Sequence, residues 1–217
     1  MSKKTIEERI EAGREYRRMA EIRVDAQEGE EQNYVVEGYA TTFNEPYVLW
    51  EDRDGWQMIE SIDAKAFENT DMSDVIMQYD HQGKVYARNK NGTLQLEADD
   101  HGLKIRADLS GTESGRQLYE EIKGGYTDKM SFGFTVDGDV YTDDGESVHR
   151  TITSIRKLYD VSAVSIPAND ATEISARSKC EGVIAEAKAE RLEAEKRAAE
   201  KERLQLRLRA MRINGGF

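Results

Sequence analysis

The chain has 217 residues, which is enough for one domain or for one domain with an extension. Its formal net charge of −12 argues against a general affinity for nucleic acid or an anionic membrane, because both require a basic surface. No apolar run is long enough to span a bilayer, and the N-terminus lacks the apolar core of a signal peptide. A single cysteine, Cys180, rules out an internal disulfide and a paired-cysteine zinc site, so a reducing cytoplasm is expected.

The first half of the chain predicts a charged helix followed by short strands. Residues 5–18 have the composition of a helix, although a glycine weakens it. Two strand-like runs follow at 20–26 and 34–43, and 64–70 is predicted as a helix of one or two turns. The run DVIMQYDH at 74–81 alternates as a strand does.

The second half predicts a hairpin, a helix and further strands. Residues 92–109 alternate around an Asp-Asp-His-Gly turn, and 112–125 is a helix that a threonine caps and two glycines end. The runs 129–136 and 147–167 follow as strands. Strands with two short inserted helices, in no regular alternation, predict a mainly β fold in the form of a small antiparallel β barrel or sandwich.

The last forty residues differ in composition from the rest. They are rich in Ala, Glu, Lys, Arg and Leu without a breaker after Gly182, which predicts one long charged helix. Lys188 and Glu195 interrupt its apolar stripe, so a strong coiled coil is not expected, and neither is packing against the body. The chain then divides into a charged helical extension (1–18), a β-barrel domain (19–175) and a helical tail (176–217).

Three histidines are the candidate bases. His101 lies in the predicted hairpin turn, where an exposed polar residue is ordinary, and His149 falls on a polar strand face. His81 ends the run 74–81 and is expected to share an apolar face with Val75, Met77 and Tyr79. That position suits a general base near neutral pH, although periodicity alone favours a histidine that only packs in the core.

Ser131 is the candidate nucleophile, and it stands in KMSFGF with Gly133 on the same strand face. A small hydroxyl beside a glycine leaves room for a substrate backbone, but a serine that only packs in the sheet fits the spacing equally. The chain has no G-x-S-x-G sequence, which disfavours an α/β-hydrolase. No two histidines have the spacing of a metal pair, so neither a metal site nor a cofactor is expected.

The ordered set of motifs resembles a known family. Residues 20–177 contain, in this order, GYATTFN, a W-x-x-I segment and AF pair, DVIMQYDH, ARNKNGTLQLEADDHGL, SGRQLYEEIKGGY, KMSFGF and LYDVSAVSIPAND. No single motif is specific, but this order at these intervals is similar to the prohead (capsid maturation) proteases of tailed bacteriophages. The resemblance implies a serine endopeptidase on a small β barrel, distantly related in fold to the herpesvirus assembly protease.

The resemblance also implies the site residues. Motif by motif, the catalytic histidine falls on His81 and the serine on Ser131. The third member is a second histidine in the herpesvirus enzymes, here His149, and an acidic residue in phage relatives, here Asp160 of LYDVS. Asp160 shares its face with Leu158, Ser162 and Val164 and should be partly buried, where a carboxylate needs a partner, so Asp160 is the expected third member and His149 the second choice.

The implied activity is cleavage of scaffold, or of the scaffolding segment of capsid protein, and of the protease's own termini. It would take place inside immature capsids (proheads) in the host cytoplasm, without nucleic acid, membrane or cofactor, and relatives of this fold often form homodimers. Backbone N–H groups at Ala168 and Asn169 are expected to bind the oxyanion, by analogy with the herpesvirus fold. A non-catalytic scaffold or capsid-assembly protein and a metal-dependent hydrolase are the alternatives.

Overall fold

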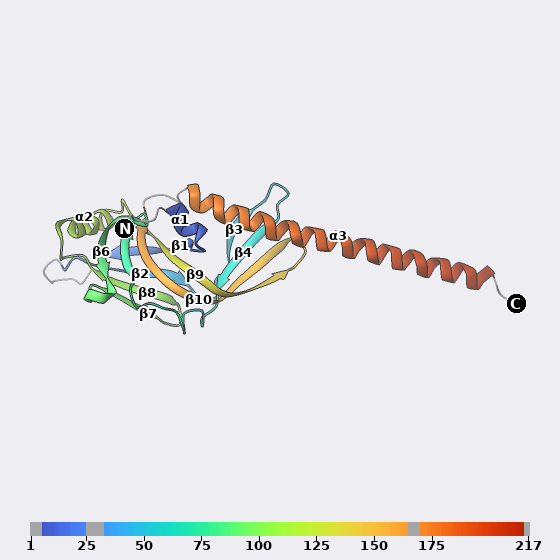
Figure 1. Cartoon of the computed structure of the whole chain (residues 1–217), viewed down its shortest axis with the longest axis horizontal. Helices are drawn as coiled ribbons and strands as arrows, with labels where there is room; N and C mark the ends of the chain where they lie inside the picture. The colour runs from blue at the N-terminus through green and yellow to red at the C-terminus, as the bar shows by residue number, and fades with distance from the viewer. Residues whose placement is uncertain (1–5, 25–32, 165–169, 215–217) are drawn as a thin grey trace.

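The computed structural model describes residues 6–24, 33–164 and 170–214 (Figure 1). The strands are β1 (Glu15–Val24), β2 (Val35–Thr42), β3 (Tyr47–Glu51), β4 (Gln57–Ile62), β5 (Ile76–Tyr79), β6 (Gln82–Arg88), β7 (Leu94–Ala98), β8 (Gly102–Asp108), β9 (Lys129–Asp143) and β10 (Ser147–Val164). The helices are α1 (Ile6–Glu11), α2 (Glu113–Lys123) and α3 (Asp170–Asn214), with one 3-10 turn, η1 (Asn89–Asn91). The fold is therefore mainly β with a long C-terminal helix, as the sequence predicts.

The strands follow the order β3-β4-β10-β9-β1-β2-β8-β7, and β5 and β6 branch from β10. Most pairings are antiparallel, but β10 pairs in parallel with β4 through its first half and with β5 through its second half. Because β10 changes its neighbour along its length, the sheet branches, and the described strands do not close into the expected barrel. The longest strands, β9 and β10, pair along most of their length, and they carry Ser131 and Asp160.

One main apolar core lies against this sheet, and α2 covers part of it with Leu118, Tyr119 and Ile122. The Thr112 side chain accepts a hydrogen bond from the Gly115 N–H, so α2 begins where the sequence predicts. The predicted helix at 64–70 is wrong, because this segment forms only turns. The Ala66 carbonyl accepts a hydrogen bond from the Ile155 N–H of β10. This carbonyl therefore bonds to the sheet and not to an N–H four residues later, as it would in an α-helix.

The N-terminal helix is shorter than the predicted 5–18. α1 ends at Glu11, Gly13 takes a φ of 85°, and β1 begins at Glu15. The N–H of Gly13 bonds to the Ile10 carbonyl and the N–H of Arg14 to the Arg9 carbonyl, which is the Schellman pattern of a helix end. The boundary expected at residue 18 therefore falls inside a strand of the sheet.

The helix α3 is continuous, as expected, but its part from Cys180 to Lys188 packs against the body. Cys180 and Ile184 are buried against Met58 and Val148, and Lys188 forms ion pairs with aspartates of the β3–β4 loop. The expectation that the tail does not contact the body is therefore wrong for this part. From residue 189 to 209 the side chains are exposed, and the helix projects beyond the sheet (Figure 1). No helix in the described ranges is both long and apolar enough to cross a membrane.

Two truncations test this division of α3. A chain that ends after Glu195 is expected to melt within about one degree of the full chain, because the residues removed make few contacts. A chain that ends after Arg177 loses the burial of Ile184, worth about 1.5–3 kcal/mol, and Tm is expected to fall by about 3–10 °C. Calorimetry on both proteins measures the difference, and equal melting temperatures would show that the docked turns add no stability.

Candidate active site

His81 lies in a tight turn and not on the strand that precedes it. Tyr79 at the end of β5 pairs with Gln82 at the start of β6, so Asp80 and His81 are the two central residues of the turn. Their φ angles are 47° and 58°, and a type I′ turn requires positive values at both positions. The expected alternation of His81 with the apolar face of β5 is therefore wrong.

This turn is strained, because a left-handed backbone costs about 1–2 kcal/mol for a residue with a Cβ atom. Hydrogen bonds on both sides maintain it. The Asp80 N–H donates to the Ala163 carbonyl of β10 at 3.0 Å, and the Arg9 guanidinium donates to the His81 carbonyl at 3.0 Å. Strain that the surroundings maintain in this way is typical of functional sites.

Replacing Asp80 by glycine and by alanine separates this backbone strain from the lost side chain. Both variants remove the same carboxylate, so the difference between them reports the backbone. Asp80→Gly is expected to be more stable than Asp80→Ala by about 1 kcal/mol, or about 2–4 °C in Tm, although glycine is the less stable residue in ordinary strands. Thermal unfolding measures both, and an alanine variant at least as stable as the glycine variant would contradict the left-handed turn.

The turn places the imidazole against side chains of β9 and β10, where three residues form one hydrogen-bonded chain. The Ser131 Oγ lies 2.6 Å from His81 Nε2, and His81 Nδ1 lies 2.5 Å from Asp160 Oδ1. Each of the three residues is at most 6% exposed. With a carboxylate on Nδ1, we assign the proton to that nitrogen, which leaves Nε2 to accept the serine hydroxyl. The distance expected between Ser131 and His81 is present, and their catalytic roles stay predictions.

Asp160 is buried and ionised. Its Oδ1 also accepts the Ser162 hydroxyl at 2.9 Å, and Arg14 Nη1 lies 3.5 Å from its Oδ2. Burial raises the pKa of the Asp160 carboxyl, but the His81 imidazole and then the Arg14 guanidinium more than offset it, so the pKa lies below its usual range. The carboxylate therefore keeps its charge at neutral pH.

The space that Gly133 leaves by having no side chain is filled by the carboxylate of Asp160. The interpretation from sequence, that this space receives a substrate backbone, is wrong. The two residues are paired across β9 and β10. A Cβ atom on Gly133 would lie 2.6 Å from Asp160 Oδ2 and 2.8 Å from the ring of Tyr16. That ring stands edge-on to His81, with centroids 4.4 Å apart. A glycine is thus required for two side chains to pack around the imidazole.

The other predicted residues lie elsewhere. His149 lies near the start of β10, part-exposed, with its Nε2 hydrogen-bonded to Asp144 at 2.9 Å. His101 is exposed, with its ring edge-on to Tyr39. The histidine chain therefore continues to Asp160 and not to His149. Ala168 and Asn169 lie outside the described residues.

Sequence reasoning missed two neighbours of the site, Arg14 and Tyr16, because it placed them in a helical extension. Gly13 was the available signal, since a glycine after a short charged helix is a common C-terminal cap. Arg14 precedes β1 and faces Asp160, and Tyr16, on β1, stands against the His81 ring.

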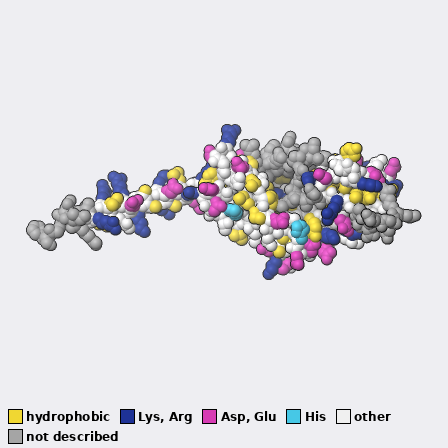
Figure 2. Space-filling view, turned by 180° about the vertical axis from the view of Figure 1, so that it is seen from behind, with side chains coloured by type: hydrophobic (Ala, Val, Ile, Leu, Met, Phe, Trp, Pro, Cys, Tyr) yellow, Lys and Arg dark blue, Asp and Glu magenta, His cyan; other side chains and the backbone are white. Residues whose placement is uncertain are grey.

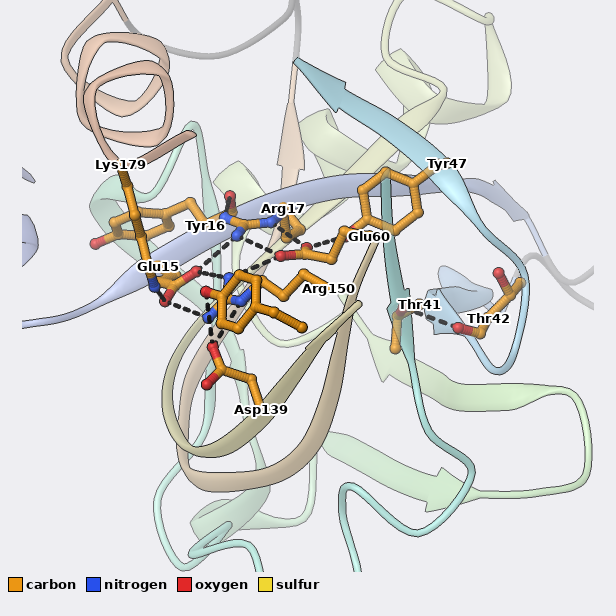
Figure 3. A network of polar contacts seen from close by, with 11 residues as sticks. Glu15, Tyr16, Arg17, Thr41, Thr42, Tyr47, Glu60, Asp139, Arg150 and Lys179 are labelled. Atoms are coloured by element: carbon orange, nitrogen blue, oxygen red, sulfur yellow. Dashed lines mark hydrogen bonds and ion pairs between the residues drawn. The ribbon is translucent and has the colours of Figure 1, made fainter. Parts of the chain in front are cut away.

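Sequence reasoning also missed a buried ionic cluster beside the site, formed by Glu15, Arg17, Glu60 and Arg150 (Figure 3). Arg17 donates to Glu60 at 2.5 and 2.9 Å, and Arg150 bridges Glu60 at 2.7 Å and Glu15 at 2.7 Å. Glu60 is fully buried and Arg150 is 2% exposed. The cluster joins β1, β4 and β10, with Tyr47, Asp139 and Lys179 bonded at its rim. It fixes the start of β1, the strand that carries Tyr16.

A serine, a histidine and a buried carboxylate in one hydrogen-bonded chain form the arrangement of a serine hydrolase. The chain matches the caudovirus prohead serine protease family over residues 20–185, more than half of its length, and it belongs to that family. This confirms the resemblance of the ordered motifs. The chain is 28% identical over 156 residues to the prohead protease of Enterobacteria phage HK97, covering 71% of this chain and 65% of that protein. No solved structure matches.

Proposed function

We propose that the chain is a serine endopeptidase that cleaves capsid or scaffold proteins inside the prohead during phage capsid maturation. The observation that carries the proposal is the Ser131–His81–Asp160 chain in a member of the prohead serine protease family. The chain spans 65% of the HK97 relative, so its activity and substrates are proposed from the site and not transferred from that protein.

The geometry supports acyl transfer. His81 Nε2 accepts the proton of Ser131 as Oγ attacks the scissile carbonyl carbon, and Asp160 stabilises the imidazolium that forms. The imidazolium then gives its proton to the leaving amine, and a water molecule, activated by the same imidazole, hydrolyses the acyl-enzyme. Because Asp160 holds Nδ1, the ring is already oriented for both proton transfers.

We include the chain's own termini among the substrates. The projecting part of α3 is exposed from residue 189 to 209, with cationic and acidic side chains interspersed along it (Figure 2). This segment makes few contacts with the body, so its removal would leave the sheet and the site intact.

The test is cleavage by purified protein of the capsid and scaffold proteins of the same virus, followed by mass spectrometry. Wild type and a Ser61→Ala control, whose hydroxyl contacts Thr151, are expected to yield the same fragments, and Ser131→Ala none. A fluorophosphonate probe should label Ser131 alone. Cleavage by Ser131→Ala at the wild-type rate would reject the mechanism. A wild type that neither cleaves nor takes the probe would indicate a non-catalytic assembly protein.

Gly133→Ala is expected to lower the cleavage rate by about 10²-fold, since the new Cβ atom would displace the Asp160 carboxylate by roughly 1 Å. Gly138→Ala on the same strand is the matched control, because its Cβ atom would meet nothing closer than 3.2 Å. Steady-state cleavage of a peptide measures both rates. Full activity in Gly133→Ala would show that Asp160 does not need its observed position.

A further inference from the structure

The position of Arg14 follows from the end of α1. The Schellman turn at Gly13 stops the helix, and the chain then runs straight into β1. Arg14 is the residue between the turn and the strand, so its backbone is fixed from both sides. Arg9, one turn earlier, donates to the His81 carbonyl and attaches α1 to the catalytic turn. The N-terminal arm (residues 6–16) therefore belongs to the wall of the site.

The Arg14 guanidinium is held in one place by two contacts. Its central carbon lies 3.5 Å from the centroid of the Tyr159 ring, and its Nη1 lies 3.5 Å from Asp160 Oδ2. The side chain is 17% exposed. Stacking on an aromatic ring leaves the edge of the guanidinium free to face a carboxylate, which lysine cannot reproduce.

The two oxygens of Asp160 have different partners. Oδ1 accepts from His81 and from Ser162, and Oδ2 faces Arg14. We propose that Arg14 is a positioning residue of the triad, which fixes the carboxylate with Oδ1 toward His81 and offsets part of its negative charge. The inference rests on the proposed protease function and adds a fourth residue to it.

Of the charged groups around the imidazole, Arg14 is the one that changes the net charge acting on the His81–Asp160 pair. From β10 the ring meets Asp160, and from β1 it meets Tyr16, whose pKa is raised by burial and by Asp160, so the phenol is neutral at working pH. Arg9 contacts the backbone of His81, and Asp80 precedes it in the turn. Among the described residues, Arg14 is the cation that forms an ion pair with Asp160 in addition to His81.

Removing the guanidinium is expected to change both the rate and its pH dependence. Without Arg14 the full negative charge of Asp160 acts on His81, which favours the protonated imidazole. In Arg14→Ala the acid limb of the kcat profile is expected to move to higher pH by about half a unit to one unit. At the pH optimum kcat is expected to fall by about tenfold or more, with KM unchanged, because the carboxylate is less firmly oriented.

Three further variants separate charge from packing. Arg14→Lys keeps the charge and is expected to restore the acid limb, and Arg14→Gln keeps an N–H donor without charge and is expected to leave it displaced. Arg156→Ala removes an exposed arginine of β10 that pairs with Asp137, and it should behave as wild type. A merely structural Arg14 would lower Tm in the alanine variant and leave the acid limb of every variant in place, which would overturn the proposal.

Nuclear magnetic resonance gives a readout that does not need protease activity. The chain has only three histidines, so the ring signals of His81 can be assigned with His101→Gln and His149→Gln variants. The titration midpoint of the His81 signals is expected to rise in Arg14→Ala and to return in Arg14→Lys. An unchanged midpoint would refute the role of Arg14 even in an active enzyme. A wild type without cleavage would instead refute the proposed function, whatever the titration shows.

Discussion

Asp160→Asn is expected to lower kcat for peptide cleavage by about 10⁴-fold while the protein stays folded. An asparagine can place its amide N–H against Nδ1, which favours the tautomer with the proton on Nε2. That nitrogen then cannot accept the Ser131 proton, and the imidazolium loses its counter-charge. Peptide hydrolysis and circular dichroism measure the two properties. The matched control is Asp137→Asn, which alters an exposed ion pair with Arg156. A fall in kcat of less than tenfold in Asp160→Asn would remove Asp160 from the mechanism.

The wild-type pH profile belongs to the same test. The pKa of the Asp160 carboxyl is held below its ordinary 3.8, so that carboxylate stays ionised throughout the working range. A loss of activity along an acid limb therefore reports the protonation of another group, the general base. The circular dichroism spectrum should not change over that limb, because loss of activity by unfolding would alter both together.

Glu60→Gln is expected to lower the free energy of unfolding by about 3–5 kcal/mol, or Tm by about 10 °C. Glu60 is fully buried, and its two oxygens accept from Arg17 and Arg150. Removing its charge leaves two buried guanidinium groups short of a partner. Glu37→Gln is the control, since Glu37 pairs with Arg106 at a part-exposed site, where an ion pair contributes about 1 kcal/mol or less. Equal losses in the two variants would show that the cluster does not stabilise the fold.

The stability difference between wild type and Glu60→Gln is expected to depend on pH in one direction. Burial raises the pKa of Glu60, but Arg17 and then Arg150 more than offset it, so the pKa lies below its ordinary 4.5. The stabilisation by ionised Glu60 is therefore fully present above pH 4.5, the ordinary pKa of a glutamate. It is lost as the pH falls through the lower pKa that Glu60 has in the folded protein. The gap in Tm between wild type and Glu60→Gln is expected to be constant from about pH 6 to 8 and to narrow in acid. A gap that widened in acid would contradict an ionised Glu60.

Much of the fold could be predicted from local patterns, and the errors occur where distant contacts decide. The strands around 94–109, the cap at Thr112 and the long C-terminal helix each have a signal within a few residues. The start of β1 has none, because EYRRM lacks an apolar alternation. Its buried Arg17 is satisfied by Glu60, 43 residues away, a partner that no local pattern reveals. The packing of Ile184 against Met58 is equally non-local.

The site was predictable from the order of motifs and not from periodicity. The alternation of Met77 and Tyr79 gave no sign that the strand would end before His81, since the turn uses Asp-His where Asn-Gly is usual. Gly133 was recognised as making space but assigned to the wrong occupant, because the clash that requires a glycine involves a residue of the neighbouring strand. Which of Asp160 and His149 lies against the His81 ring depends on the fold, which places Asp160 at Nδ1 and His149 beside Asp144.

One part of α3 is docked on the body and the other projects from it, so the end of the helix is held at a defined distance from the body. Its docked turns are fastened to the body by buried Ile184, by Lys188 and by a hydrogen bond from Arg191 to the Gly145 carbonyl. About 23 residues of helix, from 192 to 214, extend beyond them, or roughly 35 Å at 1.5 Å per residue. A helix of this length would hold any molecule bound at its far end at a set distance from Ser131. Deleting whole turns from the projecting part would shorten that distance without altering the contacts of Ser131, His81 and Asp160, because the residues removed are exposed.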